Sequence, residues 1–197
     1  QQEEDFALVY ILRHESFKKY IVIKTYLNEL EIETISDIFK GANWLEREVY
    51  DQYGISFKNH PNLRRVLNHK EFVGHPLRKS YPITKGQILY ETDDLVDEMN
   101  YRLLSKDLVC KADNGLFSEC SKDLMFLNLG PSHPASHGTI RTYVALDGET
   151  VEAAVSEIGY LHRGFEKSCE NHTYNQIVPY TDRLNYCSAI SNNIAFV

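Results

Sequence analysis

The chain of 197 residues is long enough to bury the core of one or two small domains. Hydrophobic residues make up 43% of it and charged residues 25%, which is ordinary for a globular protein. Its net charge of −7 argues against a nucleic-acid partner, because phosphate binding needs a basic surface. No stretch approaches the roughly 20 apolar residues that cross a bilayer, so we predict no direct membrane span and expect membrane association only through a partner.

Four cysteines stand at positions 110, 120, 169 and 187, with neither a Cys-x-x-Cys pair nor a regular spacing. This arrangement favours reduced thiols over a disulfide framework or a closed zinc site, so we predict no metal site. The chain begins without methionine or a signal peptide and stops inside an apolar segment. We therefore expect a fragment of a longer protein.

The first elements are predicted to be a hairpin and a helix. Asp5–Leu12 and Lys19–Leu27 are rich in β-branched and aromatic residues and flank a short charged turn, which predicts paired strands. Asn43 is the predicted N-cap of a helix over Trp44–Tyr53, which Gly54 ends. The predicted apolar face of this helix consists of Trp44, Leu45, Val49 and Tyr53.

The middle of the chain carries weaker patterns. Ile55–Pro82 contains His-Pro twice and several basic residues, so we expect an extended loop that faces a partner. From about Lys85 to Asp123 we predict a linker that contains one helix. That helix follows Thr92 and has one apolar side, made of Leu95, Met99 and Leu103.

Alternating hydrophobicity returns after the linker. Leu124–Leu129 predicts a strand, and Thr139–Leu146 with Thr150–Ile158 predicts a hairpin around Asp147-Gly148. Strands and helices in separate blocks predict the α+β class.

The end of the chain is predicted to be helical after Gly164. We predict a break before Pro179, because the residue before proline avoids the helical conformation. A last helix is predicted to start near Thr181 or Asp182.

The loop over residues 130–141 reads GPSHPASHGTIR and contains two histidines, His133 and His137. A loop punctuated by glycine and proline holds polar groups outside regular ladders, where they can face a ligand. The alternative is a tight turn whose histidines bind only backbone. Two histidines are too few ligands for a metal, so we assign His133 to shaping the loop.

The first block contains three unusual words, ANWLEREVYDQYG at 42–54, HPNLRRVL at 60–67 and GHPLRKSYP at 74–82. In this order and spacing they resemble the C subunit of the proton-pumping NADH:quinone oxidoreductase, respiratory complex I. Their carboxylates neighbour arginines, which favours ion pairs of the fold or of an interface over acid–base catalysis. The charged residues concerned are Glu46, Glu48, Arg64 and Arg65.

Words of the second block resemble the D subunit of the same enzyme. They are NLGPSHPASHG at 128–138, IGYLHRGFEK at 158–167, Thr173-Tyr174 and PYTDRLNY at 179–186. The order C then D resembles the fused C/D subunit of some bacteria. The resemblance implies a small α/β C-like domain over 1–88, a linker over 89–122 and a D-like region over 123–197. In that last region an antiparallel hairpin would lead into helices, as at the start of a hydrogenase-large-subunit-like domain.

The resemblance implies a peripheral-arm subunit on the cytoplasmic face of the bacterial inner membrane. Its C-like part would be an assembly scaffold, and its D-like part would form a wall of the site where quinone is reduced. NADH, FMN and the iron–sulfur clusters would belong to partner subunits, so we expect no cofactor bound directly by this chain. Electron transfer from NADH would be coupled to proton translocation in the assembled complex.

The resemblance also assigns residues. A reduced quinone takes one proton at each carbonyl oxygen, and imidazole and phenol groups are suitable donors. In the family those two positions correspond to His137 and Tyr186, although Tyr186 alone would be read as a core tyrosine. Arg163 corresponds to an arginine near the terminal iron–sulfur cluster, which a neighbouring subunit holds. We expect contacts with other subunits from basic residues of the C-like part, namely His60, Arg64, Arg65, His75, Arg78 and Lys79.

Two alternatives remain at this level. The large subunit of a membrane-bound nickel–iron hydrogenase with a fused C-like domain would have the same order of parts. Such enzymes carry Cys-x-x-Cys where this chain has Asn185 and Ser188, and nickel needs those thiolates. A pure assembly scaffold is the other alternative, because the sequence has no glycine-rich nucleotide loop. Position 185 is commonly Asp in the oxidoreductase family, which leaves the preference for ubiquinone or menaquinone open.

Overall fold

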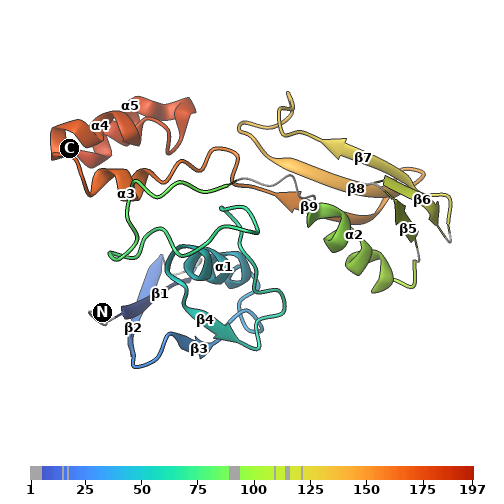
Figure 1. Ribbon diagram of the computed structural model, residues 1–197, viewed down its shortest axis with the longest axis horizontal. Coiled ribbons are helices and arrows are strands. Elements are labelled where there is room, and N and C mark those ends of the chain that lie inside the picture. The colour runs from blue at the N-terminus through green and yellow to red at the C-terminus, as the bar shows by residue number, and fades with distance from the viewer. Residues whose placement is uncertain are drawn as a thin grey trace. The chain divides into compact units, whose positions relative to one another are not determined.

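The computed structural model describes residues 6–14, 16, 18–88, 94–108, 110–113, 116–120 and 122–197. The chain forms two compact units, residues 1–65 and 66–197, and each is described by itself (Figure 1). Small sheets and short helices make up both, which confirms the predicted mixture of α and β elements. The sequence domains 1–88, 89–122 and 123–197, like the hydrogenase-like character of the last, stay predictions.

The first unit opens with the predicted hairpin. Strands β1 (Phe6–His14) and β2 (Lys19–Leu27) pair antiparallel in unbroken register. Side chains of β1 alternate between half-buried and exposed, as a strand with one packed face should. Two three-residue strands, β3 (Glu31–Glu33) and β4 (Ser56–Lys58), form a parallel pair that the sequence did not predict. Three residues are too few to show the alternation of apolar and polar residues that predicts a strand.

Helix α1 (Ala42–Tyr53) ends as predicted but starts differently. Gly54 adopts the left-handed conformation and its N–H donates to the carbonyl of Tyr50 at 2.8 Å. The predicted cap Asn43 is wrong, because the N-cap is Gly41 and no side chain caps the helix. Asn43 lies inside the helix.

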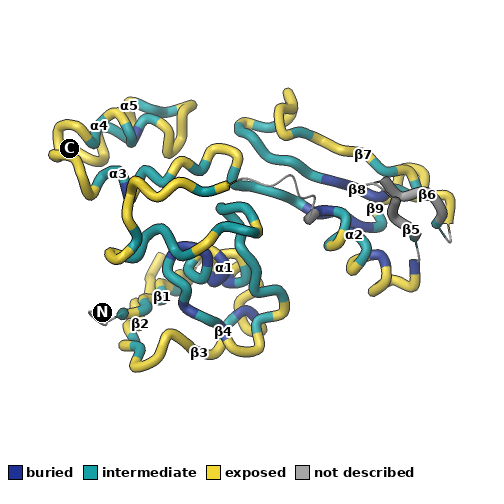
Figure 2. Tube along the Cα trace, viewed as in Figure 1, coloured by how far each residue is buried: buried dark blue, intermediate teal, exposed yellow. Residues whose placement is uncertain are grey.

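The polar face of α1 is the buried one, so the predicted apolar face is wrong. Trp44 and Leu45 are 39% and 64% exposed, whereas the buried members are Ala42, Glu46, Arg47, Asp51 and Gln52 (Figure 2). For Glu46, Arg47 and Asp51, hydrogen bonds to neighbouring segments outweigh hydrophobicity, because buried polar groups are tolerated when they are paired.

Those hydrogen bonds tie α1 to the chain before and after it. The Glu46 carboxylate accepts from the N–H of Ile35 at 2.8 Å and from the hydroxyl of Thr34. Arg47 donates to the carbonyls of Arg64 and Arg65 at 3.2 Å each. Helix α1 thus positions both segments through polar contacts.

The second unit contains a three-stranded sheet of β7 (Met125–Leu129), β8 (Arg141–Asp147) and β9 (Thr150–Glu157), in that order. This confirms the predicted strand and hairpin. Helix α2 (Asp94–Leu104) packs beside β9. Its predicted apolar side is confirmed, because the buried cluster joins α2, the following turn and the sheet through Leu95, Met99, Leu103, Leu108, Tyr143, Ala145, Ala153 and Val155.

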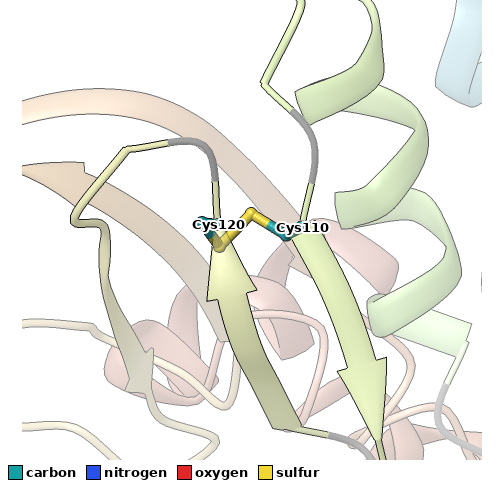
Figure 3. The surroundings of a disulfide bond; sticks show 2 residues. All are labelled: Cys110 and Cys120. Atoms are coloured by element: carbon teal, nitrogen blue, oxygen red, sulfur yellow. A yellow bond between two sulfur atoms is a disulfide. The ribbon is translucent and has the colours of Figure 1, made fainter.

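The predicted linker contains a second hairpin that the sequence did not reveal. Strands β5 (Cys110–Asp113) and β6 (Leu116–Cys120) pair antiparallel with Cys110 opposite Cys120. A disulfide joins these two cysteines (Figure 3), so the prediction of four reduced thiols is wrong for this pair. The strand register, which linear spacing does not show, brings them together. Cys169 and Cys187 remain free thiols.

Short helices end the chain: α3 (Phe165–Cys169), α4 (Tyr174–Thr181), the 3₁₀ turn η1 (Tyr186–Ser188) and α5 (Ala189–Phe196). The predicted break before Pro179 is wrong, because Pro179 lies inside α4. Proline has no N–H, so Pro179 costs the helix one hydrogen bond near its C-terminal end. A capping box between Thr173 and Gln176 stabilises the N-terminal end.

The last helix begins at Ala189, later than predicted, because turns and η1 occupy the residues before it. The buried hydroxyl of Thr181 donates to the side chain of Asn193 at 2.6 Å and joins α4 to α5. Among the described residues, no helix combines the length and apolar character needed to pass through a bilayer.

The disulfide predicts a thiol count. Alkylation of the chain, purified without reductant and denatured, should modify two cysteines, and reduction beforehand should raise the number to four. Replacing both Cys110 and Cys120 by Ser should lower the free energy of unfolding by about 2–4 kcal/mol, because a closed loop restricts the unfolded chain. Four modified cysteines without reductant would contradict the cross-link; mass spectrometry of the intact chain makes the count.

The buried carboxylate of α1 predicts a contrast between two neighbouring glutamates. Glu46→Gln should lower the free energy of unfolding by about 1–3 kcal/mol, because an NH₂ group replaces one of two oxygens that each accept a hydrogen bond. Exposed Glu48 is the matched control, and Glu48→Gln should change it by less than about 0.5 kcal/mol. Urea unfolding followed by the fluorescence of Trp44, the single tryptophan, measures both. Equal midpoints would contradict the assignment.

Candidate functional site

The histidine loop connects the paired strands β7 and β8. It begins with a cis peptide bond between Gly130 and Pro131. The Nδ1 of His133 accepts from the N–H of Ala135 at 3.2 Å, and its carbonyl accepts from Ser136. His133 thus has the contacts of a loop-shaping residue. The side chain of His137 is exposed.

Tyr186 lies in η1 and is 44% exposed. In the described part of the chain, neither a hydrogen bond nor a ring contact joins it to His137. The two predicted donors are thus separate, accessible side chains. A core role for Tyr186 does not fit its exposure.

A pocket of about 320 Å³ in the second unit lies between the neighbours of both residues. Thr139, two residues after His137, and Leu184, two residues before Tyr186, both line it. The remaining lining residues come from the chain between these points and from Leu67; they are Ile158, Gly159, Leu161, His162, Arg163, Phe165, Glu166, Tyr180 and Arg183. The histidine loop and the D-like words at 158–167 and 179–186 therefore meet at one cavity.

Arg163 is held at this pocket by aromatic packing. Its guanidinium carbon lies 5.0 Å from the centre of the Tyr180 ring, within the range of a cation–π contact. His172 also stacks on Tyr180, with ring centres 5.6 Å apart, and the Nε2 of His172 is 3.3 Å from the phenol oxygen. Arg163 itself is exposed, so its positive charge at the pocket wall is accessible to solvent.

Two titratable groups near the pocket have raised pKa values. Burial, followed by Glu166, raises the pKa of the Cys169 thiol, while Arg163 opposes the rise. Burial and a hydrogen bond to Glu157 raise the pKa of Tyr160 to about 12. Both groups therefore stay protonated at neutral pH.

Three of the six predicted interface residues lie in the first unit, and each makes a contact within that unit. The His60 imidazole is fully buried: its Nδ1 accepts from the N–H of Asn62 at 3.0 Å and its Nε2 lies 3.1 Å from the carbonyl of Asn43. Arg65 donates to the buried carboxylate of Asp51 at 2.7 Å. Arg64 offers its carbonyl to Arg47.

The other three predicted interface residues lie in the second unit. His75 and Arg78 are half-buried, and Lys79 is exposed and paired with Glu170. The carbonyl of Arg78 accepts from the ammonium of Lys167 at 2.8 Å. Sequence reasoning missed Lys167 and Glu170, although both stand in or beside a D-like word; their partners are about 90 residues away in the chain.

No group of three or more histidine, cysteine, aspartate or glutamate side chains suited to a metal occurs in the described ranges. Apart from Glu166, the charged and aromatic groups of the pocket are the cations Arg163 and Arg183 and the rings of His162, Phe165 and Tyr180. Such a lining is better suited to bind an electron-rich or anionic group than a metal ion.

Comparison with known proteins gives two kinds of match. Residues 1–87 match the family model of the respiratory-chain NADH dehydrogenase 30 kDa subunit. Over 99% of its length the chain is 44% identical to the NADH-quinone oxidoreductase C/D subunit of Bdellovibrio bacteriovorus. Over 98% it is 40% identical to the C/D subunits of Acinetobacter baumannii and Acinetobacter baylyi. The chain spans 33% of the length of each of these relatives.

The relatives carry the C-like and the D-like parts under one name, and the matched stretch includes both sets of motifs. The family model independently covers the C-like words. The recognition made from the motifs is therefore confirmed: this chain is a relative of the fused C/D subunit of NADH-quinone oxidoreductase.

Proposed function

We propose that the chain is part of the peripheral arm of a proton-translocating NADH:quinone oxidoreductase, at the cytoplasmic face of the bacterial inner membrane. Its D-like part forms a wall of the quinone-reduction site, and its C-like part is a scaffold. The observation that carries the proposal is one pocket lined by Thr139 of the histidine loop and by residues of two D-like words, among them Arg163 and Leu184. The names of the relatives support the same activity.

The proposed chemistry at the quinone uses His137 and Tyr186. Reduction to the quinol adds two electrons and two protons, one proton at each carbonyl oxygen. An imidazolium gives up its proton more readily than a phenol, so His137 donates a proton and Tyr186 donates a hydrogen bond. Both side chains are exposed in this chain, which leaves them free to meet a head group and a partner subunit.

Arg163 has a separate role in this proposal. NADH oxidation, FMN and the iron–sulfur clusters belong to partner subunits, and the terminal cluster lies next to the Arg163 side of the pocket. A guanidinium fixed over Tyr180 keeps its charge in one place. A fixed positive charge stabilises the reduced, more negative form of a cluster.

The segments that carry all six basic residues are proposed to contact other subunits. Within the first unit His60 and Arg65 also make internal contacts through their side chains, and Arg64 makes one through its carbonyl. Lys79 is the best candidate for a direct contact, because its side chain is 72% exposed.

The quinone role predicts the effect of removing one hydroxyl. Tyr186→Phe in the assembled enzyme should lower quinone turnover by about 10²- to 10³-fold, because a donor to the developing oxyanion is lost. His137→Ala should impair the same step, and the double variant should lose less than the product of the two effects. Reduction of ferricyanide by NADH, which bypasses the quinone, is the control and should persist. Normal quinone turnover in Tyr186→Phe would end this assignment.

The electrostatic role of Arg163 predicts a spectroscopic change. Arg163→Met keeps the length of the side chain but removes its charge, so the reduction potential of the terminal cluster should fall. A redox titration monitored by electron paramagnetic resonance measures it. An unchanged potential together with weakened quinone binding would move Arg163 from the cluster to the quinone.

The interface role predicts that Lys79→Glu lowers the amount of assembled peripheral arm, because it reverses an exposed charge and places it beside Glu170. Native gels of membrane extracts measure the abundance of the complex. Lys122→Glu is the control on an exposed edge of the sheet, where Lys122 also pairs with carboxylates. Equal abundance in the two variants would remove Lys79 from the interface.

A further inference from the structure

A buried ammonium connects the C-like words to the D-like words within the second unit. Lys167 of α3 is only 9% exposed, and its Nζ donates to the Arg78 carbonyl at 2.8 Å and lies 3.5 Å from Glu170. Glu170 also pairs with Lys79, which holds the pKa of its carboxyl below the usual value. A buried lysine requires such partners, because an unpaired charge is costly away from water.

A second contact joins the same two stretches at the pocket itself. Gly159 has a φ of +106°, and a Cβ on it would lie 2.5 Å from the carbonyl oxygen of Leu67. The backbone at Leu67 therefore packs directly on the backbone at Gly159. Both residues line the pocket that Arg163 occupies.

Residues 67–87, which include both Leu67 and Arg78, form an internally bonded loop, which we name the anchor segment. The Gln87 amide pairs with both the N–H and the carbonyl of Val73, at 3.2 and 3.0 Å, and donates to the Tyr81 hydroxyl at 2.7 Å. Phe72 stacks on Tyr81 with ring centres 5.9 Å apart. These hydrogen bonds and the ring contact give the segment a defined conformation, which an unbonded linker would lack.

We propose that the anchor segment supports the pocket through Leu67 and that Lys167 is the positioning residue that holds the segment there. Helix α3 has only five residues, so tertiary contacts must fix it. Phe165 and Glu166 of α3 line the pocket. Lys167, on the same turn, fastens α3 to Arg78 and thereby sets the wall beside Arg163. The consequence for the terminal cluster rests on the proposed function; the anchoring itself does not.

Amide hydrogen exchange in the assembled enzyme tests the anchoring. The N–H of Tyr81 donates to the same Arg78 carbonyl that Lys167 binds, so peptides over 75–81 report on it. Lys167→Met should speed their exchange by about tenfold, because a hydrogen bond from a charged donor is lost. Lys167→Arg should restore at least half of the protection. Lys122→Met, which removes an exposed paired lysine elsewhere in the unit, should leave these peptides unchanged.

Equal exchange in wild type and Lys167→Met would overturn the proposal. If Lys167→Met does not assemble, Glu170→Gln decides: it removes the carboxylate partner of Lys167 from a partly exposed position and should speed exchange over 75–81 by a smaller factor. Unchanged exchange in that variant would overturn the proposal as well.

The redox titration separates this inference from the proposed function. Lys167→Met should shift the potential of the terminal cluster in the direction of Arg163→Met but less, and Lys167→Arg should reverse the shift. A shift in Arg163→Met without one in Lys167→Met would overturn the positioning role alone. No shift in Arg163→Met would count against the proposed cluster role, while the exchange data would still decide the anchoring.

Discussion

Backbone carbonyls in irregular chain need donors, and in this protein two buried cations supply donors to three of them. Residues 59–88 contain no helix or strand, so few of their carbonyls are paired in a ladder. In the first unit Arg47 reaches the carbonyls of Arg64 and Arg65, and in the second unit Lys167 reaches that of Arg78. Without these donors the irregular stretch would have to be hydrated. The paths of both segments, and the pocket wall at Leu67, follow from these contacts.

The elements predicted correctly are those whose signal is local. The hairpin of β1 and β2, the sheet of β7, β8 and β9, and the apolar side of α2 all appear as hydrophobic periodicity within a short window. Helix α1 has such a period too, but its apolar face is the more exposed one. Its buried polar partners lie 11 to 18 residues away, where no periodic pattern reaches.

The site shows the same division. The motifs identified the segments that meet at the pocket, because their words are contiguous in the sequence. Lys167 and Glu170 were missed because their roles depend on Arg78 and Lys79, distant partners in another motif. Likewise the disulfide depends on the register of β5 and β6. Neither strand is long enough for that register to be predicted from the sequence.

The close approach of Gly159 to Leu67 has a consequence for how this sequence can change. The atom that excludes a side chain at position 159 is a backbone oxygen, and every amino acid carries one. No substitution at position 67 can therefore make room for a larger residue at position 159. Relief must come from a shift of the chain path itself, through an insertion, a deletion or a proline near residue 67. Evolutionary change at position 159 thus requires mutations that alter the path of the backbone near residue 67. Such mutations are far rarer than substitutions that change only a side chain.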